Sequence, residues 1–108
     1  MTYATGTIVL LAFPFSDSLR AKQRPALILL DTNDDDIVAA RVTSQQTRSE
    51  FDVVLQGWRE AGLLLPSIVR LHKIATLEKI LVKRTLGRLS EEDKGAVRVA
   101  LEHIWRSF

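Results

Sequence analysis

The feature that most constrains the fold is a series of short aliphatic runs, each too brief for a typical helix. Three of them stand near the start of the chain, at Ile8 to Phe13, Ala26 to Leu30 and Ile37 to Val42. Short runs of β-branched and aliphatic residues bounded by turn residues are typical of buried strands. Two further runs, Phe51 to Leu55 and Ile68 to Thr76, predict additional strands. Most of the chain is therefore predicted to be β-structure.

The C-terminal stretch carries the clearest helical pattern. Ser90, with Asp93 three residues later, resembles a capping box, and the acidic residues between them favour the positive end of a helix dipole. Apolar residues then recur at spacings of three and four, in a stripe predicted to cover other structure: Val97, Leu101, Ile104, Trp105 and Phe108. Short strands before one amphipathic helix predict a mostly β fold, a bent antiparallel sheet or barrel with a C-terminal helix. At 108 residues, 1–108 is predicted to be a single domain.

The connections between these runs are also informative. A polar loop from Pro14 to Pro25 is long for a hairpin connection, and long loops are often functional. Asn33 to Asp36 predicts a tight turn, because Asn and Asp tolerate left-handed backbone and bond their own main chain. Trp58 to Gly62 predicts one helical turn closed by glycine. In the run from Ile68, alternation predicts Arg70 and His72 on one face and Lys73 on the other.

Composition narrows the class of protein. The absence of cysteine excludes disulfides, thiolate nucleophiles and thiolate metal sites, and suits a reducing cytosol. The N-terminal apolar run lacks a basic flank and is too short to span a bilayer, so we expect a cytoplasmic protein without a membrane segment. Net charge is only +2, yet six Lys or Arg residues stand against Glu78 between Arg70 and Arg88. This asymmetry fits either a basic face for phosphates or ordinary solvated charge.

Several kinds of catalytic site are excluded by what the sequence lacks. It has no phosphate-binding glycine loop, and its two histidines, His72 and His103, cannot form a histidine-rich metal site. The acidic cluster Asp34 to Asp36 reads as a solvated turn rather than a metal site, so no metal or other cofactor is expected. Arginine, threonine, serine and glutamine remain near predicted strand ends. Such residues can cleave RNA without metal, because RNA supplies its own 2′-hydroxyl nucleophile.

At this point a family resemblance appears. Six segments, in order along nearly the whole chain, resemble the successive blocks of MazF/PemK toxins, and they are Gly6-Thr7-Ile8-Val9-Leu10, Phe13-Pro14-Phe15, Arg24-Pro25-Ala26-Leu27-Ile28, Val42-Thr43-Ser44-Gln45, Pro66-Ser67-Ile68-Val69-Arg70 and Leu86-Gly87-Arg88-Leu89-Ser90. The resemblance implies an SH3-like barrel with a terminal helix, a homodimer, and neutralisation by a cognate antitoxin. It also implies the toxin of a type II system, a metal-independent, sequence-selective endoribonuclease (mRNA interferase) that cleaves single-stranded RNA to a 2′,3′-cyclic phosphate and a 5′-hydroxyl.

The resemblance also assigns roles to residues. It implies that Arg24 acts on the scissile phosphate and in proton transfer, that Thr43 stabilises the transition state, and that Arg70 takes the arginine role of the PemK branch. Where PemK-type members carry an acidic catalytic partner, this chain has His72, which is either an acid–base group or inert. Further RNA contacts are expected from nearby polar and basic residues, namely Arg20, Lys22, Ser44, Gln45 and Lys73.

Two other functions remain open from the sequence. Relatives on the same barrel poison DNA gyrase by binding it, without cleaving RNA, but they act mainly through C-terminal helix residues and lack the Arg-Pro and Thr-Ser pairing. The second alternative is a family member that has lost activity. The only hint of this is His72, which stands where PemK-type members carry an acidic residue.

Overall fold

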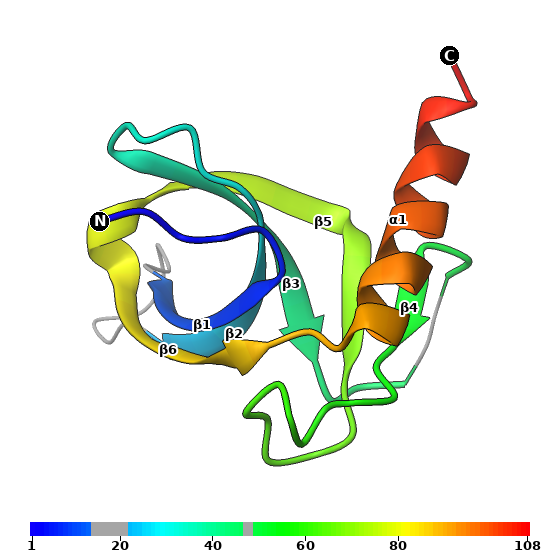
Figure 1. The fold of residues 1–108 in the computed structure, drawn as a ribbon, viewed down its shortest axis with the longest axis horizontal. Coiled ribbons are helices and arrows are strands. Elements are labelled where there is room, and N and C mark those ends of the chain that lie inside the picture. The colour runs from blue at the N-terminus through cyan, green and yellow to red at the C-terminus, as the bar shows by residue number, and fades with distance from the viewer. Residues whose placement is uncertain (14–21, 47–48) are drawn as a thin grey trace.

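A computed structural model describes residues 1–13, 22–46 and 49–108, and within them six strands form one antiparallel sheet. The sheet order is β4-β5-β3-β2-β1-β6, and the strands curl into a barrel with α1 beside it (Figure 1). The elements are β1 (Thr7–Phe13), β2 (Lys22–Leu30), β3 (Asp36–Thr43), β4 (Asp52–Val54), β5 (Ile68–Glu78), the 3-10 turn η1 (Lys79–Leu81), β6 (Val82–Arg88) and α1 (Glu91–Trp105). The predicted mostly β fold with a C-terminal helix is confirmed.

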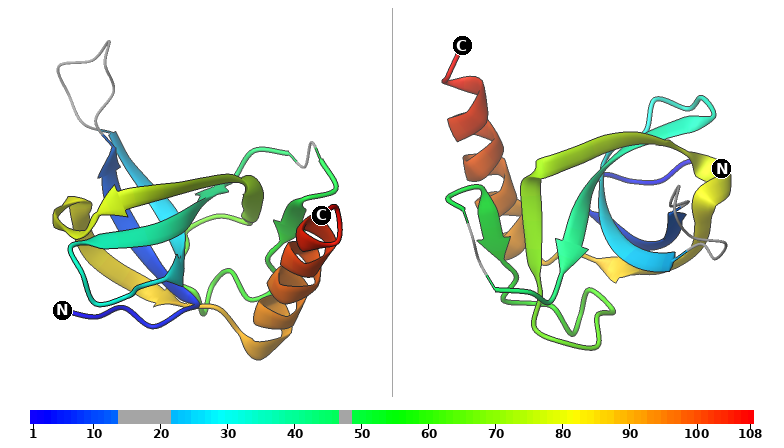
Figure 2. Two further views of the ribbon diagram at one scale, coloured as in Figure 1. Left: turned by 90° about the horizontal axis from the view of Figure 1, so that it is seen from above. Right: turned by 180° about the vertical axis from the view of Figure 1, so that it is seen from behind.

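The sheet has a hydrophobic core on each of its two faces. Val9 and Ile28 belong to the core inside the curled strands. Ile8 and Leu27, their sequence neighbours, project to the opposite face and join a core that includes Val97 of α1. Seen from behind in Figure 2, α1 and β4 lie on one side of the molecule and β1, β2 and β6 on the other. Because alternate residues of a strand serve opposite faces, β1 is apolar at nearly every position.

All five predicted strands are present, although β2 begins earlier than predicted. Residues 22–25 were expected in the loop but belong to the strand, where Pro25 pairs with Leu10 of β1. Pairing with β3 begins only at Ala26, so the missing N–H of Pro25 disrupts no bond on that side. The strand β6 was not predicted. It pairs with β1 at the edge of the sheet, and its exposed Lys83 and Arg84 obscure the strand pattern.

Burial along β5 divides the strand into two halves instead of alternating, although Arg70 and His72 both lie beside Asp52, as their predicted common face requires. Residues 68–71 are all buried, and residues 72–76 are all exposed. The cause is a register shift, because Ala40 pairs with Ile74 while the next residue of β3, Arg41, pairs with Arg70. Residues 71–73 of β5 therefore have no partner in β3. Such an irregularity bends a strand and re-aims its side chains, so each half of β5 has its own surroundings.

Both predicted turns are confirmed. Asn33 adopts a left-handed φ of 69°, and the backbone N–H of Asp36 donates to Asp34 Oδ1 over 3.0 Å. The helical turn after Gly57 is closed by Gly62, whose φ is 83°. A Cβ at residue 62 would collide with the backbone carbonyl of Leu86, so glycine is required there for both conformation and space.

The helix α1 begins where the sequence predicts. The backbone N–H of Asp93 donates to the N-cap Ser90 Oγ over 3.1 Å. Val97 is buried, and the middle of the apolar stripe packs against the core, but the prediction for the end of the stripe is wrong. Trp105 is 65% exposed and Phe108 fully exposed, because the last turn of α1 extends beyond the sheet (Figure 1). Among the described residues, no helix is both long and apolar enough to span a membrane.

Candidate active site

Arg24 and Thr43 belong to the neighbouring strands β2 and β3. The described pairing of these strands ends at Ala26 with Arg41, and Arg24 and Thr43 each lie two residues beyond that pair. Alternate residues of a strand share a face, so Arg24 projects on the face of Ala26 and Thr43 on the face of Arg41. Both residues line one cleft of about 280 Å³. The structure therefore brings together the two residues on which the predicted chemistry depends.

The hydroxyl of Thr43 is held in a defined position. Its Oγ1 accepts the backbone N–H of Gln45 over 3.2 Å. A hydroxyl has two acceptor lone pairs and one donor hydrogen, so this bond leaves the O–H of Thr43 to donate elsewhere. The same bond fixes the turn that carries Ser44, which lines the cleft. Gln45 is exposed and lies outside the described lining of the cleft.

The remaining walls of the cleft combine positive charge with apolar surface. Arg41 and Arg84 line it together with Arg24, and no aspartate or glutamate belongs to its described lining. Leu64, which is 93% exposed, and Leu65 lie at the apolar side. Three guanidinium groups without an acid make the cleft suitable for an anion with several charges. Sequence reasoning missed Arg41 and Arg84, although the alternation of β3 would have placed Arg41 on the face of Thr43.

Arg70 lies next to this cleft, but its guanidinium is already bound. Its Nη1 forms an ion pair with Asp52 Oδ2 at 2.9 Å, and its Nη2 donates to the Gln46 carbonyl over 3.2 Å. The side chains are 6% and 0% exposed, so the pair is shielded from water. Arg70 thereby connects β4 to the segment that follows the Thr43-Ser44 motif. Sequence reasoning missed Asp52, because only the strand pairing of Asp52 with Arg70 reveals it.

His72 stands in the unpaired part of β5, beside the same aspartate. Its Nδ1 lies 3.8 Å from Asp52 Oδ1 and 3.5 Å from Ser49 Oγ, and its side chain is 38% exposed. An acidic side chain is thus present near this position after all, supplied by β4. His72 does not belong to the described lining of the cleft that contains Arg24 and Thr43.

A comparison with known protein families identifies the family of this chain. A family model described as "PemK-like, MazF-like toxin of type II toxin-antitoxin system" matches residues 4–105. The chain belongs to this toxin family. A comparison with curated proteins found no match.

Solved structures of MazF toxins have the same fold. MazE-MazF (Form-III) from Deinococcus radiodurans aligns with a TM-score of 0.76 at 21% identity, over 94% of each chain. The Mycobacterium tuberculosis toxin MazF-mt6 gives 0.74 at 21% identity, over 93% of this chain and 96% of that one. An endoribonuclease in complex with its cognate antitoxin, from a mycobacterial species, gives 0.71 at 21% identity, over 90% and 88%.

The other residues predicted to bind RNA in this MazF-like chain are Lys73, Lys22 and Arg20. Lys73 is exposed and lines a neighbouring cleft that also contains Arg41. Lys22 belongs to β2, where it pairs with Phe13, but its side chain lies outside the described part. Arg20 lies entirely outside the described residues.

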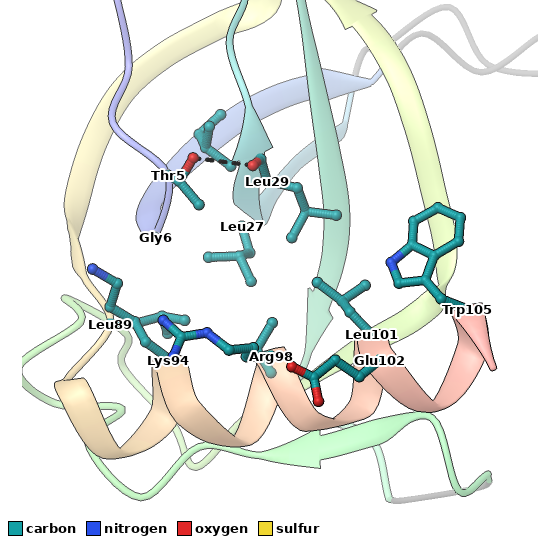
Figure 3. Close-up of a pocket in the computed structure, with 12 residues that line it drawn as sticks. Thr5, Gly6, Leu27, Leu29, Leu89, Lys94, Arg98, Leu101, Glu102 and Trp105 are labelled. Atoms are coloured by element: carbon teal, nitrogen blue, oxygen red, sulfur yellow. Dashed lines mark hydrogen bonds between the residues drawn. The ribbon is translucent and has the colours of Figure 1, made fainter.

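A second cleft of this MazF-like fold lies between α1 and the end of β2 (Figure 3). Its wall is mainly apolar, with Leu29 and Leu101, and Thr5 Oγ1 donates to the Leu29 carbonyl over 3.0 Å. None of the predicted site residues lines it.

No described group of three or more His, Asp, Glu or Cys residues has the arrangement of a metal site. The cleft with Arg24 and Thr43 is therefore the stronger candidate for catalysis.

Proposed function

We propose that this toxin is a metal-independent endoribonuclease that cleaves single-stranded RNA, including mRNA, at selected sequences. The observation that carries the proposal is the presence of Arg24 and Thr43 in one cleft whose described lining has no acidic residue. In the reaction, the 2′-oxygen forms a bond to the adjacent phosphorus, and the bond from phosphorus to the 5′-oxygen breaks. The products carry a 2′,3′-cyclic phosphate and a 5′-hydroxyl.

Arg24 is assigned to the scissile phosphate. A guanidinium offers a planar set of donors that matches two phosphate oxygens and keeps its charge at neutral pH. Negative charge on these oxygens increases in the transition state, so a fixed cation beside them lowers the barrier. The Thr43 hydroxyl, with its donor hydrogen left available by the Gln45 contact, would donate to the same phosphate group.

Proton transfer is assigned to Arg24, as the family resemblance implies, with His72 as the alternative acid–base group. The reaction takes a proton from the 2′-hydroxyl and gives one to the 5′-oxygen. Nδ1 of His72 lies 3.8 Å from Asp52 Oδ1, beyond hydrogen-bond distance, and the ring is outside the described lining of the cleft, so this alternative requires the histidine to move toward the bound RNA. Arg70 is assigned to positioning, because its contacts with Asp52 and Gln46 connect the histidine side of the site to the threonine side.

Further substrate contacts and partners complete the proposal. We assign RNA contacts outside the reacting phosphate to basic and polar residues around the site, namely Arg20, Lys22, Ser44, Gln45 and Lys73. We also propose that the toxin acts in the cytoplasm as a homodimer and is inhibited by a cognate antitoxin. A MazE-MazF structure and a mycobacterial endoribonuclease with its antitoxin are among the similar folds. A monomeric mass in light scattering at micromolar concentration would contradict the dimer.

Cleavage of labelled single-stranded RNA in EDTA tests the proposal directly. The wild type is expected to give discrete fragments with 5′-hydroxyl ends. Arg24→Ala and Thr43→Ala are each expected to lower the rate by about 100-fold or more, since loss of one transition-state donor typically has that effect. Arg88→Ala, on an exposed position of β6 outside the cleft, is the matched control and should keep the rate. Uncut RNA from a folded wild type would reject the nuclease and favour a toxin that binds a protein target.

A further inference from the structure

Arg41 occupies a central position on the face of the sheet that carries the candidate site. It is opposite Ala26 of β2 on one side and opposite Arg70 of β5 on the other. Thr43 lies two residues further along the same strand and therefore projects from the same face. Arg41 is half-buried and lines the cleft that contains Arg24 and Thr43.

The charges around Arg41 are unusual for a strand pair. Like charges directly opposite each other on neighbouring strands are destabilising, and here Arg41 opposes Arg70. Asp52 neutralises Arg70 through an ion pair of 2.9 Å. Arg41 lines the cleft with Arg24 and Thr43 and the neighbouring cleft with Lys73, and the described lining of these two clefts contains no aspartate or glutamate. A half-buried cation without a carboxylate is unfavourable unless water or an anionic ligand compensates it. The arrangement is therefore suited to receive an anion at Arg41.

We propose that Arg41 binds a backbone phosphate of the RNA, next to the phosphate held by Arg24. This inference rests on the proposed function. The guanidinium of Arg70 is committed to Asp52 and to the Gln46 carbonyl. Its cross-strand neighbour Arg41 therefore supplies a guanidinium to the cleft, in addition to those of Arg24 and Arg84. A phosphodiester has two free oxygens, which match the paired donors of a guanidinium. The contact is to the backbone, so it adds affinity for any sequence rather than selectivity for one base.

Binding of uniformly 2′-O-methylated, mixed-sequence, single-stranded RNA tests this role without cleavage, because the nucleophile is blocked. Fluorescence anisotropy would give Kd at several salt concentrations for the wild type, Arg41→Gln, Arg41→Lys and the control Arg88→Gln. Loss of a charge-assisted hydrogen bond corresponds to a rise in Kd of about 10- to 100-fold for Arg41→Gln. The slope of log K against log salt should fall by about 0.7, the value for one phosphate contact on a single strand.

The remaining variants separate charge from geometry and from folding. Arg41→Lys keeps the charge but not the paired donors, so it should keep the salt slope and lose part of the affinity. Arg88→Gln removes the same group from an exposed position outside the cleft and should bind with nearly wild-type affinity. A salt slope that is unchanged in folded Arg41→Gln would overturn the proposal, because a purely structural arginine would not alter it.

Failure of the proposed function would look different. A wild type that binds the methylated RNA but never cleaves ordinary RNA would reject the nuclease and leave the Arg41 comparison valid on binding alone. A wild type that binds no RNA at low salt would overturn both proposals. Equal losses of affinity in Arg41→Gln and Arg88→Gln would also overturn the role of Arg41, since they would indicate general attraction to positive charge.

Discussion

Asp93→Ala is expected to destabilise the toxin by far more than removal of a neighbouring acid. Asp93 is 1% exposed, and its two carboxylate oxygens accept the backbone N–H groups of Gln56 and Gly57, each over 2.9 Å. These bonds attach the turn over residues 56–62 to the first turn of α1. Alanine would leave both amides without their acceptor, and the same turn leads into the leucine wall of the candidate site.

The size of the effect follows from these contacts. A fully buried backbone N–H that loses its hydrogen-bond partner lowers the free energy of unfolding by about 1–3 kcal/mol. Because Gln56 is exposed, water can replace part of the lost bond. We therefore use about 1–2 kcal/mol for each of the two amides. The expected loss for Asp93→Ala is therefore about 2–4 kcal/mol of unfolding free energy. Glu92→Ala, one residue earlier and exposed, removes only a favourable interaction with the helix dipole and should cost about 0.3–1 kcal/mol.

Urea unfolding, followed by tryptophan fluorescence at a single protein concentration, measures both variants. With a slope of about 2 kcal/mol per molar urea, Asp93→Ala should lower the midpoint by roughly 1–2 M. Asp93→Asn keeps one acceptor oxygen and should lose about half as much free energy as alanine. Equal midpoints for Asp93→Ala and Glu92→Ala would refute the reasoning, because they would mean that the carboxylate does not hold the turn to the helix.

Three further outcomes are expected. The Lys79 ammonium and the backbone N–H of Tyr3 lower the pKa of Asp31 to about 2. The contribution of Asp31 to stability is therefore complete above about pH 4 and is lost as the pH falls toward 2. Between pH 5 and 2, the urea midpoint of Asp31→Asn should fall less steeply than that of the wild type. Gly62→Ala should lower stability by at least about 2 kcal/mol, because its backbone is left-handed and a Cβ would collide with the Leu86 carbonyl. Gly95→Ala should raise stability by about 0.5–1 kcal/mol, because a Cβ there meets open space in α1. Thermal melts of both variants at one protein concentration check this. His72→Gln should lower the cleavage rate of the folded toxin, and an unchanged rate would assign the proton transfer to another group.

The elements of this fold were largely predictable from local sequence patterns. The short aliphatic runs that became β1, β2, β3 and β5 contribute buried residues to the cores, and their brevity and bounding turn residues distinguish them from helix. The N-cap Ser90 marks the start of α1 in the same direct way. The edge strand β6 escaped prediction because its exposed residues are charged, and charge on an edge is a protective feature rather than a strand signal.

The candidate site was predictable only in part, because it depends on strand register. The sequence suggests Arg24 and Thr43 through their motifs, but only the pairing of β2 with β3 brings them to one cleft. The partnership of Asp52 with Arg70 depends on how β4 pairs with β5, which no local pattern indicates. Where side chains from separate strands must meet, a shift of one residue changes the face of every side chain.

The wall of the cleft formed by Leu64 and Leu65 has an evolutionary consequence. Gly62 fixes where this segment leaves the preceding turn, and the Leu55 N–H bonds the Ser67 carbonyl at its other end, so the path of the backbone is set outside the two leucines. Both side chains are more than half exposed and belong to neither core. Mutations at these two positions can therefore accumulate with little loss of stability, and descendants of this toxin can change the surface presented to the proposed RNA substrate while they keep the same barrel.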